Sequence, residues 1–212
     1  MVDLIEFDTI YHEHFSYLSF YTVKLIFESQ GLELFDVDEI PTHGGSLRIY
    51  AKHKEDKTKE ISNNTVMLLE KELSKGINNL SYYADFNKKA MQLKHTFTEF
   101  ILHKKLEGRK IAGYGAAAKG NTFLNSCGLK HSEIDFVVDS NPHKQNKWLP
   151  ASHIPVVSEA FLESEKPDYI VILPWNLKDE ITQKLSYVKG WGGKFVIGIP
   201  VLEVIETLGI II

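Results

Sequence analysis

The stretch DTIYHEHFSY, residues 8–17, carries several side chains that can exchange protons. Histidine titrates near neutral pH, so His12 or His14 can take a proton from a carbon or a hydroxyl group of a substrate. The neighbouring Glu13 can orient an imidazole, and Tyr11 can polarise a carbonyl or stabilise an enolate. The cluster therefore indicates acid/base chemistry.

Two other interpretations of this cluster remain open from the residues alone. On a strand, His12 and His14 would share one face while Glu13 pointed to the other, so a metal ion would need further ligands. The sequence has no HExxH motif and its single cysteine forms no cluster, which argues against zinc. A histidine or glutamate before a helix also often caps the helix or pairs locally, without taking part in chemistry.

A second candidate site is the glycine-rich turn GYGAAA, residues 113–118, which fits G-x-G-x-x-G/A between a strand and a helix. Small residues let a ligand approach the backbone, and the first N–H groups of a helix favour phosphate. Lys119 adds a positive charge, and Asp139 ends the next strand, where a ribose-binding acid is expected. Taken alone, the turn indicates a nucleotide-type ligand such as NAD or S-adenosylmethionine; the alternative is that its small residues only pack a helix against a sheet.

The polar and basic loop 140–148 follows Asp139 at the carboxyl end of a strand, where doubly wound sheets bind ligands. The turn and this loop together supply the predicted substrate-binding residues. These are Gly113, Tyr114, Gly115, Ala116, Lys119, Asn121, Asp139, Asn141 and Lys144.

The spacing of apolar residues predicts the elements that position these side chains. In the first half of the chain it indicates a helix over 16–30, strands over 32–40 and 46–51, and mostly helix over 61–107. From residue 108, strands alternate with helices, which is typical of a parallel sheet in an α/β fold. The strands predicted there are 109–115, 134–139, 169–173 and 194–199, and the helices are 116–126, 158–164 and 177–188.

Composition bounds the class of protein. The 212 residues are 43% hydrophobic and 25% charged, enough for one large domain or two small ones. A net charge of −4 favours neither nucleic acid nor an anionic membrane surface, and no apolar run approaches the roughly 20 residues that span a bilayer. Cys127 is the single cysteine, so no intrachain disulfide can form and a cytoplasmic location is expected.

Four motifs occur in the order FDTIYHEHFSYLS, HGGSLRIYA, GYGAAAKGNTFLN and VVDSNPHKQNKWLPASHIPV. Together they resemble the C-terminal part of the S-adenosylmethionine-dependent sugar C-methyltransferases, which methylate a carbon of a nucleotide-linked 4-keto-deoxysugar. The resemblance covers nearly the whole chain. It implies the end of a methyltransferase domain at 1–52, a helical linker region at 53–107 and a Rossmann-like C-terminal domain at 108–212.

The resemblance also implies roles for individual residues. His14 matches the general base that removes the proton next to the keto group, so that C3 can be methylated. Tyr11 and Glu13 match residues that position this base and stabilise the enolate. The turn at 113–118 is expected to face the nucleotide-linked sugar, of the dTDP type, and not the methyl donor.

The chain departs from the family in one large respect. In full-length relatives the zinc-binding cysteines and the glycine-rich loop for S-adenosylmethionine lie upstream of the YHEH motif, and neither occurs here. We therefore expect a missing N-terminal half to bind most of the S-adenosylmethionine and all of the zinc. A partner subunit or upstream chain would supply that half. Residues 1–51 would then be an incomplete sheet with an exposed edge. The chain alone is expected to lack methyl transfer.

Two other functions remain compatible with the residues. One is a non-catalytic module that binds a nucleotide-linked sugar or pairs with a separate subunit. The other, less favoured, is an NAD-dependent oxidoreductase that binds its cofactor at the turn 113–118.

Overall fold

The computed structural model describes residues 1–206, without the side chain of His43. The chain divides into two compact units, each held together by backbone contacts among its own residues. Unit 1 consists of Met1–Glu13 and Asn87–Ile212, and unit 2 is His14–Phe86. The last six positions of the predicted C-terminal domain, 207–212, lie outside the described residues.

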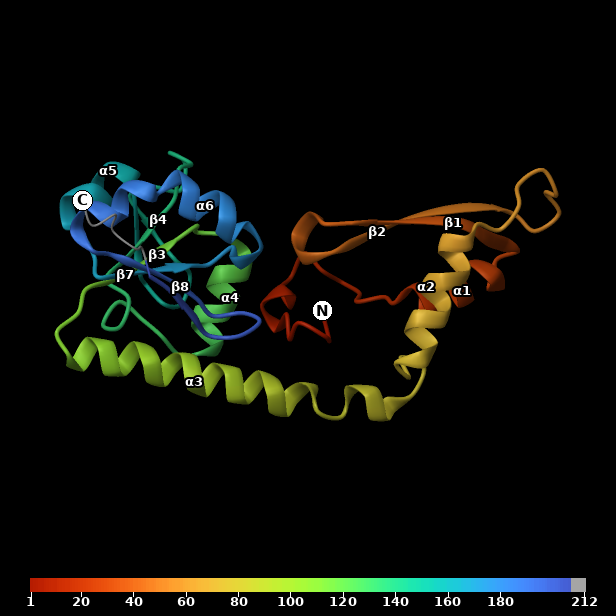
Figure 1. Ribbon diagram of the computed structural model, residues 1–212, viewed down its shortest axis with the longest axis horizontal. Helices are drawn as coiled ribbons and strands as arrows, with labels where there is room; N and C mark the ends of the chain where they lie inside the picture. Colours follow the sequence, from red (N-terminus) through yellow and green to blue (C-terminus); the bar gives the residue numbers. More distant parts are fainter. Residues whose placement is uncertain (207–212) are drawn as a thin grey trace. The chain divides into compact units, whose positions relative to one another are not determined.

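Unit 1 contains a sheet whose strands lie in the order β5-β6-β4-β3-β7-β8-β9. Figure 1 labels four of them, β3, β4, β7 and β8. Within the described residues the strands are β3 (Ile111–Tyr114), β4 (Phe136–Val138), β5 (Lys147–Trp148), β6 (Pro155–Val157), β7 (Tyr169–Ile172), β8 (Lys194–Ile197) and β9 (Glu203–Ile205). The central strands are parallel, whereas β5 and β9 at the edges pair antiparallel. This mostly parallel sheet confirms the predicted α/β, Rossmann-like fold.

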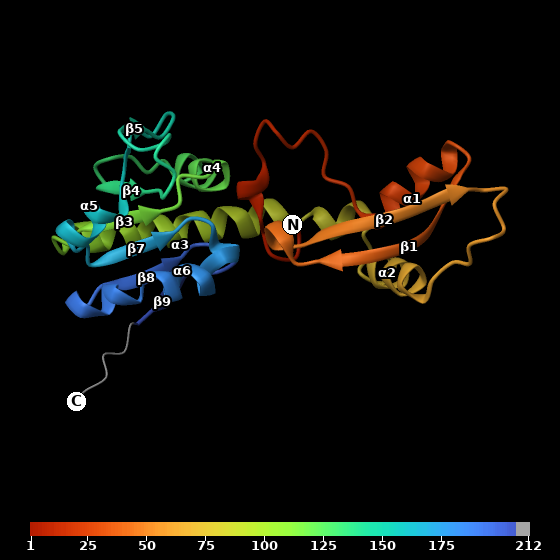
Figure 2. The ribbon, with the colours of Figure 1, turned by 90° about the horizontal axis from the view of Figure 1, so that it is seen from above.

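The strand order reverses between β3 and β7. From β3 the chain continues to β4 and β6 on one side, and then to β7 and β8 on the other. Figure 2 shows β3 and β7 side by side and pointing the same way. In doubly wound sheets the carboxyl ends of the strands at such a switch point form the usual ligand crevice. The residues that follow β3 and β7 are therefore the first candidates for a site.

Helices cover both faces of this sheet (Figure 1). One face carries α3 (Phe86–Leu106) and α4 (Ala118–Ser126), and the other carries α5 (Glu159–Glu165) and α6 (Lys178–Lys184). Phe97 of α3 packs on Phe123 of α4 with ring centroids 4.7 Å apart, and Phe161 of α5 packs on Phe136 of β4 at 5.1 Å. Because both faces are covered, every residue of β3 and β4 is buried, as their unbroken apolar runs predict.

The sequence pattern missed three short strands and one helix break. Strands β5, β6 and β9 have only two or three residues each, too few to show an alternating pattern. The helix predicted over 177–188 is interrupted, because α6 ends at Lys184 and a 3₁₀ helix occupies Ser186–Trp191. Gly192, with φ 77°, ends that 3₁₀ helix in the left-handed conformation that glycine adopts readily.

Unit 2 is a β-hairpin packed against helices. Its main elements are α1 (Phe20–Ser29), β1 (Leu32–Ile40), β2 (Ser46–His53) and α2 (Asn63–Ser74). Ser19 caps α1 by accepting a hydrogen bond from the N–H of Thr22, and Gly31 follows the helix with φ 74°. Both predicted strands are confirmed, with the second strand two residues longer than expected. The helix predicted over 16–30 is present as α1, but it begins four residues later, after the cap at Ser19.

The core of unit 2 lies between the hairpin and the two helices. Its buried members are Phe20, Leu34, Val37 and Leu68, joined by the partly buried Val23, Phe27, Ile49 and Leu69. Glu72 of α2 accepts hydrogen bonds from the N–H groups of Phe20, at 3.0 Å, and Tyr21, at 2.7 Å. A carboxylate at this position favours α1, because it faces the positive end of the helix dipole.

In the part of the chain that the structure describes, the hairpin leaves the outer edges of both of its strands without a partner strand. Within the described residues the sheet of unit 2 has two strands, and β2 pairs with β1 alone. A two-stranded hairpin is only marginally stable by itself, and an open edge is a template for pairing with another strand. The sheet of unit 2 therefore has room for a further strand beside β2.

Candidate active site

The acid/base cluster lies on a solvent-exposed segment with no regular secondary structure. The side chains of His12 and Glu13 are 86% and 68% exposed, and His12 Nε2 lies 4.0 Å from Glu13 Oε1. The ring of Tyr11 lies 6.4 Å from that of His12, and the ring of His14 lies 6.2 Å from that of Tyr17. The boundary between the units falls after Glu13, so Tyr11 and Glu13 belong to unit 1 and His14 to unit 2.

The segment before the cluster is held firmly on unit 1. Residues Phe7–Thr9 form a 3₁₀ helix and all three are buried. Phe7 packs on Phe123 of α4, with ring centroids 5.9 Å apart. Asp8 Oδ2 accepts a hydrogen bond of 2.9 Å from Nε1 of Trp175, which lies three residues beyond β7. Exposed acid/base groups thus follow directly after a buried anchor.

Several amide groups of the glycine-rich turn are bonded within the protein. The N–H of Gly115 donates to the carbonyl of Val138 at 2.7 Å, and that of Ala117 donates to the carbonyl of Gly115 at 2.8 Å. A Cβ on Gly115, whose φ is +92°, would lie 2.6 Å from Cδ of Pro174. Gly115 therefore permits close packing against the chain that follows β7, and contact of the turn with a ligand stays a prediction.

The structure brings four of the predicted substrate-binding residues together. Asp139 is 8% exposed, and its carboxylate accepts hydrogen bonds from the N–H of Ala116 at 2.9 Å and the N–H of Asn141 at 2.8 Å. Lys144 Nζ donates to the same carboxylate at 3.0 Å and to the carbonyl of Ala116 at 2.9 Å. These bonds hold the loop after β4 on the glycine-rich turn, and contact of the four residues with a substrate stays a prediction.

Lys119 and Asn121 lie on α4, beside the anchor of the N-terminal segment. Lys119 is 8% exposed, and its Nζ lies 5.2 Å from the ring centroid of Trp175. Burial raises the pKa of Asp8, and the hydrogen bond from Trp175 and the charge of Lys119 offset part of that rise. Oδ1 of Asn121 is buried and has no hydrogen-bond partner among the described residues.

Tyr114 takes part in a different network, on the face covered by α5 and α6. Its hydroxyl donates to Glu159 Oε1 at 2.5 Å and accepts from Lys184 Nζ at 2.9 Å, and Lys184 also bonds to Glu159. Burial raises the pKa of the Tyr114 phenol, and the Glu159 carboxylate raises the pKa of Lys184. No sequence pattern indicates this trio, because its members are 45 and 25 positions apart.

The described residues do not present a cradle for the methyl donor or a metal ion. In the turn that matches a dinucleotide motif, the N–H groups of Gly115, Ala116 and Ala117 are bonded within the protein, and Pro174 fills the space above Gly115. Among the described side chains, which do not include that of His43, no three histidine, cysteine, aspartate or glutamate residues gather as a metal site requires. No binding step for either group is therefore assigned to this chain.

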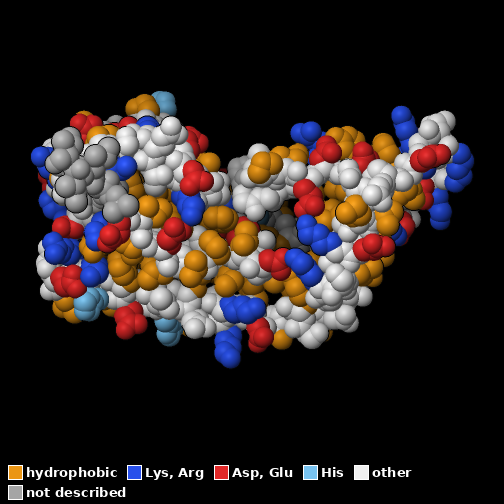
Figure 3. All heavy atoms as spheres, viewed as in Figure 1, with side chains coloured by type: hydrophobic (Ala, Val, Ile, Leu, Met, Phe, Trp, Pro, Cys, Tyr) orange, Lys and Arg blue, Asp and Glu red, His pale blue; other side chains and the backbone are white. Residues whose placement is uncertain are grey.

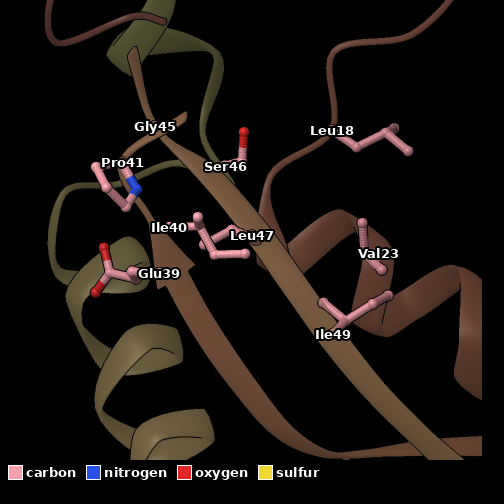
Figure 4. A pocket seen from close by; sticks show the side chains of 9 residues that line it. All are labelled: Leu18, Val23, Glu39, Ile40, Pro41, Gly45, Ser46, Leu47 and Ile49. Atoms are coloured by element: carbon pink, nitrogen blue, oxygen red, sulfur yellow. The ribbon is translucent and has the colours of Figure 1, made fainter. Parts of the chain in front are cut away.

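An apolar hollow of about 720 Å³ lies in unit 2 between the start of α1 and the turn end of the hairpin (Figure 4). Val23 of α1 and Leu18 before it lie on one side, and the hairpin residues Ile40, Leu47 and Ile49 lie on the other. Leu18 is 52% exposed and Leu47 38% exposed. Apolar side chains also reach the surface elsewhere on this unit (Figure 3). Unit 2 thus contains both unpaired strand edges and an apolar hollow beside the hairpin.

The comparisons with known proteins agree on one family. A family model described as "C-methyltransferase C-terminal domain" matches residues 41–200. The chain is 36% identical to C-methyltransferase NovU of Streptomyces niveus over 202 residues, which make up 95% of this chain and 48% of NovU. The chain therefore spans about half the length of this relative. No helix in the described part of the chain has the length and apolar character needed to cross a membrane.

Proposed function

Because the chain belongs to the C-methyltransferase family through its C-terminal domain, we propose that it is the C-terminal portion of a sugar C-methyltransferase. The intact enzyme would transfer a methyl group from S-adenosylmethionine to C3 of a nucleotide-linked 4-ketosugar. The similarity to NovU over 95% of the chain carries this proposal. The free thiol of Cys127 fits a reaction in the reducing cytoplasm.

Methylation of carbon explains why the acid/base cluster is needed. A saturated carbon has no electron pair to offer, so a proton must first leave the carbon next to the keto group. His14 is the base that takes this proton, and Tyr11 and Glu13 orient the base and stabilise the enolate oxygen. The methyl donor, when bound, supplies an electrophilic methyl group. The exposure of His12 and Glu13 in this chain fits a pocket that further chain completes.

The nucleotide-linked sugar, of the dTDP type, would bind near α4 and the loop 140–148. Two observations support this placement. Asn121 has a buried side-chain oxygen that lacks a partner among the described residues, and the side chain of Lys144 is 41% exposed. Lys144 could therefore reach a phosphate group while it still contacts Asp139.

The part of the enzyme that this chain does not cover would complete unit 2. The open edge of β2 can pair with a strand of that part, and the hollow between β2 and α1 can take its apolar side chains. The chain is therefore expected to lack methyl transfer alone and to acquire it with a polypeptide that matches the uncovered half of NovU. Methylated product from the isolated chain, with S-adenosylmethionine and a dTDP-4-ketosugar, would refute this division of labour.

A further inference from the structure

The cluster that is proposed to abstract the proton begins on unit 1. The buried 3₁₀ helix Phe7–Thr9 ends two residues before Tyr11, and Tyr11 and Glu13 belong to the same unit as the sheet of seven strands. The groups that hold Phe7–Thr9 therefore also limit where Tyr11 and Glu13 can lie.

Those groups converge at the switch point of the sheet. Trp175 lies just after β7 and donates its indole N–H to Asp8, while Lys119 lies in the first turn of α4, the helix that follows β3. The Lys119 ammonium lies over the Trp175 ring, and its charge acts on the Asp8 carboxylate. The carboxyl ends of β3 and β7, where a doubly wound fold usually holds a ligand, thus hold a segment of the chain itself.

The contact of Asp8 with Trp175 and Lys119 is buried. Asp8 is 1% exposed, Lys119 8% and Trp175 9%. A carboxylate at such depth is unfavourable unless a donor and a positive charge face it. Trp175 donates to Oδ2 and Lys119 supplies the charge, while Oδ1 is buried without a hydrogen-bond partner among the described residues. An apolar side chain at position 8 could fill a buried space without that requirement. The hydrogen bond from Trp175 to Asp8 is directional, so it restrains the position of the segment more narrowly than apolar packing would.

We propose that Asp8, Trp175 and Lys119 are positioning residues that form a clamp, and that this clamp sets the geometry of Tyr11 and Glu13 for proton abstraction. The existence of the clamp is independent of the proposed function, but its catalytic role rests on that function. Displacement of a catalytic group by about 1 Å can reduce a rate by about 100-fold, so a loosened clamp should be visible in turnover.

The first test measures backbone hydrogen exchange over residues 7–13 in this chain. Trp175→Phe removes the indole donor and keeps an aromatic ring for Lys119. Trp191→Phe is the matched control, because its indole N–H also makes one hydrogen bond, of 3.0 Å, to the carbonyl of Pro167. We expect exchange over residues 7–13 to be about tenfold faster in Trp175→Phe and unchanged in Trp191→Phe. Equal exchange in both variants would overturn the clamp.

The second test uses the chain in complex with the polypeptide that matches the rest of NovU. Trp175→Phe and Asp8→Ala should each lower kcat about 10- to 100-fold and leave the KM for the sugar within about twofold. The double variant should lose no more than either single variant, because both changes open the same clamp. The positioning role would be overturned if the kcat losses of the single variants multiplied in the double variant, or if Trp175→Phe had a normal kcat. A wild-type complex without methyl transfer would instead contradict the proposed function, and hydrogen exchange would still decide whether the clamp exists.

Discussion

Replacing Gly115 with alanine should destabilise unit 1 strongly. An alanine at φ +92° costs about 1–2 kcal/mol in backbone strain. Its Cβ would also lie 2.6 Å from Cδ and 2.8 Å from Cγ of Pro174, atoms of a rigid ring that cannot rotate away. Overpacking of this kind costs a further 1–3 kcal/mol or so. Together the two effects predict a loss of about 2–5 kcal/mol in the free energy of unfolding.

Gly128→Ala separates the two contributions. Gly128 has a similar φ of +71°, but a Cβ there would meet no atom within 4 Å. It should therefore cost only the backbone term, about 1–2 kcal/mol. The difference between the two variants isolates the contact with Pro174 and should be about 1–3 kcal/mol.

Urea unfolding followed by tryptophan fluorescence measures this difference in the correct unit. The three tryptophans, at positions 148, 175 and 191, all belong to unit 1. With a slope of about 2 kcal/mol per molar urea, the midpoint of Gly115→Ala should lie about 0.5–1.5 M below that of Gly128→Ala. Equal midpoints would refute the conclusion that close packing against Pro174 requires glycine at this turn.

Two further predictions concern single carboxylates. Glu72→Gln should loosen α1, because a charged acceptor for the N–H groups of Phe20 and Tyr21 is lost. We expect amide hydrogen exchange over residues 20–29 to be about tenfold faster in this variant. Glu70→Gln, at an exposed position, is the control and should leave this exchange unchanged. Unchanged exchange in Glu72→Gln would contradict the capping role. Burial raises the pKa of Asp8 above 3.8, so protonated Asp8 is favoured in the folded state. This contribution to the free energy of unfolding is present at low pH and is lost as the pH rises through the folded-state pKa. Asp8→Asn should therefore gain stability relative to wild type as the pH rises from about 4 to 7, and a falling or flat difference would contradict this sign; the exposed Asp179→Asn is the control.

Local patterns predicted the elements that local physics determines. Ser19, the apolar spacing after it and Gly31 define α1, and the alternation in 32–40 defines β1 to the residue. The buried runs of β3 and β4 were visible as apolar segments, and their parallel pairing followed from the alternation with helices.

The contacts that build the site were not predictable in the same way. Asp8 and Trp175 are 167 positions apart, and nothing in either neighbourhood indicates the other. Gly115 fits a nucleotide motif by its spacing. In the structure, close contact with Pro174 leaves no room for a Cβ at this position, and sequence spacing cannot show that contact. Tyr114 was grouped with Lys119 by position, whereas the fold pairs it with Glu159 and Lys184. Long-range packing decides each of these cases.

Hydrogen–deuterium exchange at C3 of the substrate tests most directly whether His14 is the base. The complex of this chain with the rest of the enzyme is incubated in D₂O with a dTDP-4-ketosugar and without a methyl donor, and mass spectrometry follows deuterium uptake. The wild type and His12→Gln should incorporate one deuterium at C3, and His14→Gln should do so at least about 100-fold more slowly. Undiminished uptake in His14→Gln would contradict the assignment of His14 as the base, and therefore the central claim about this cluster.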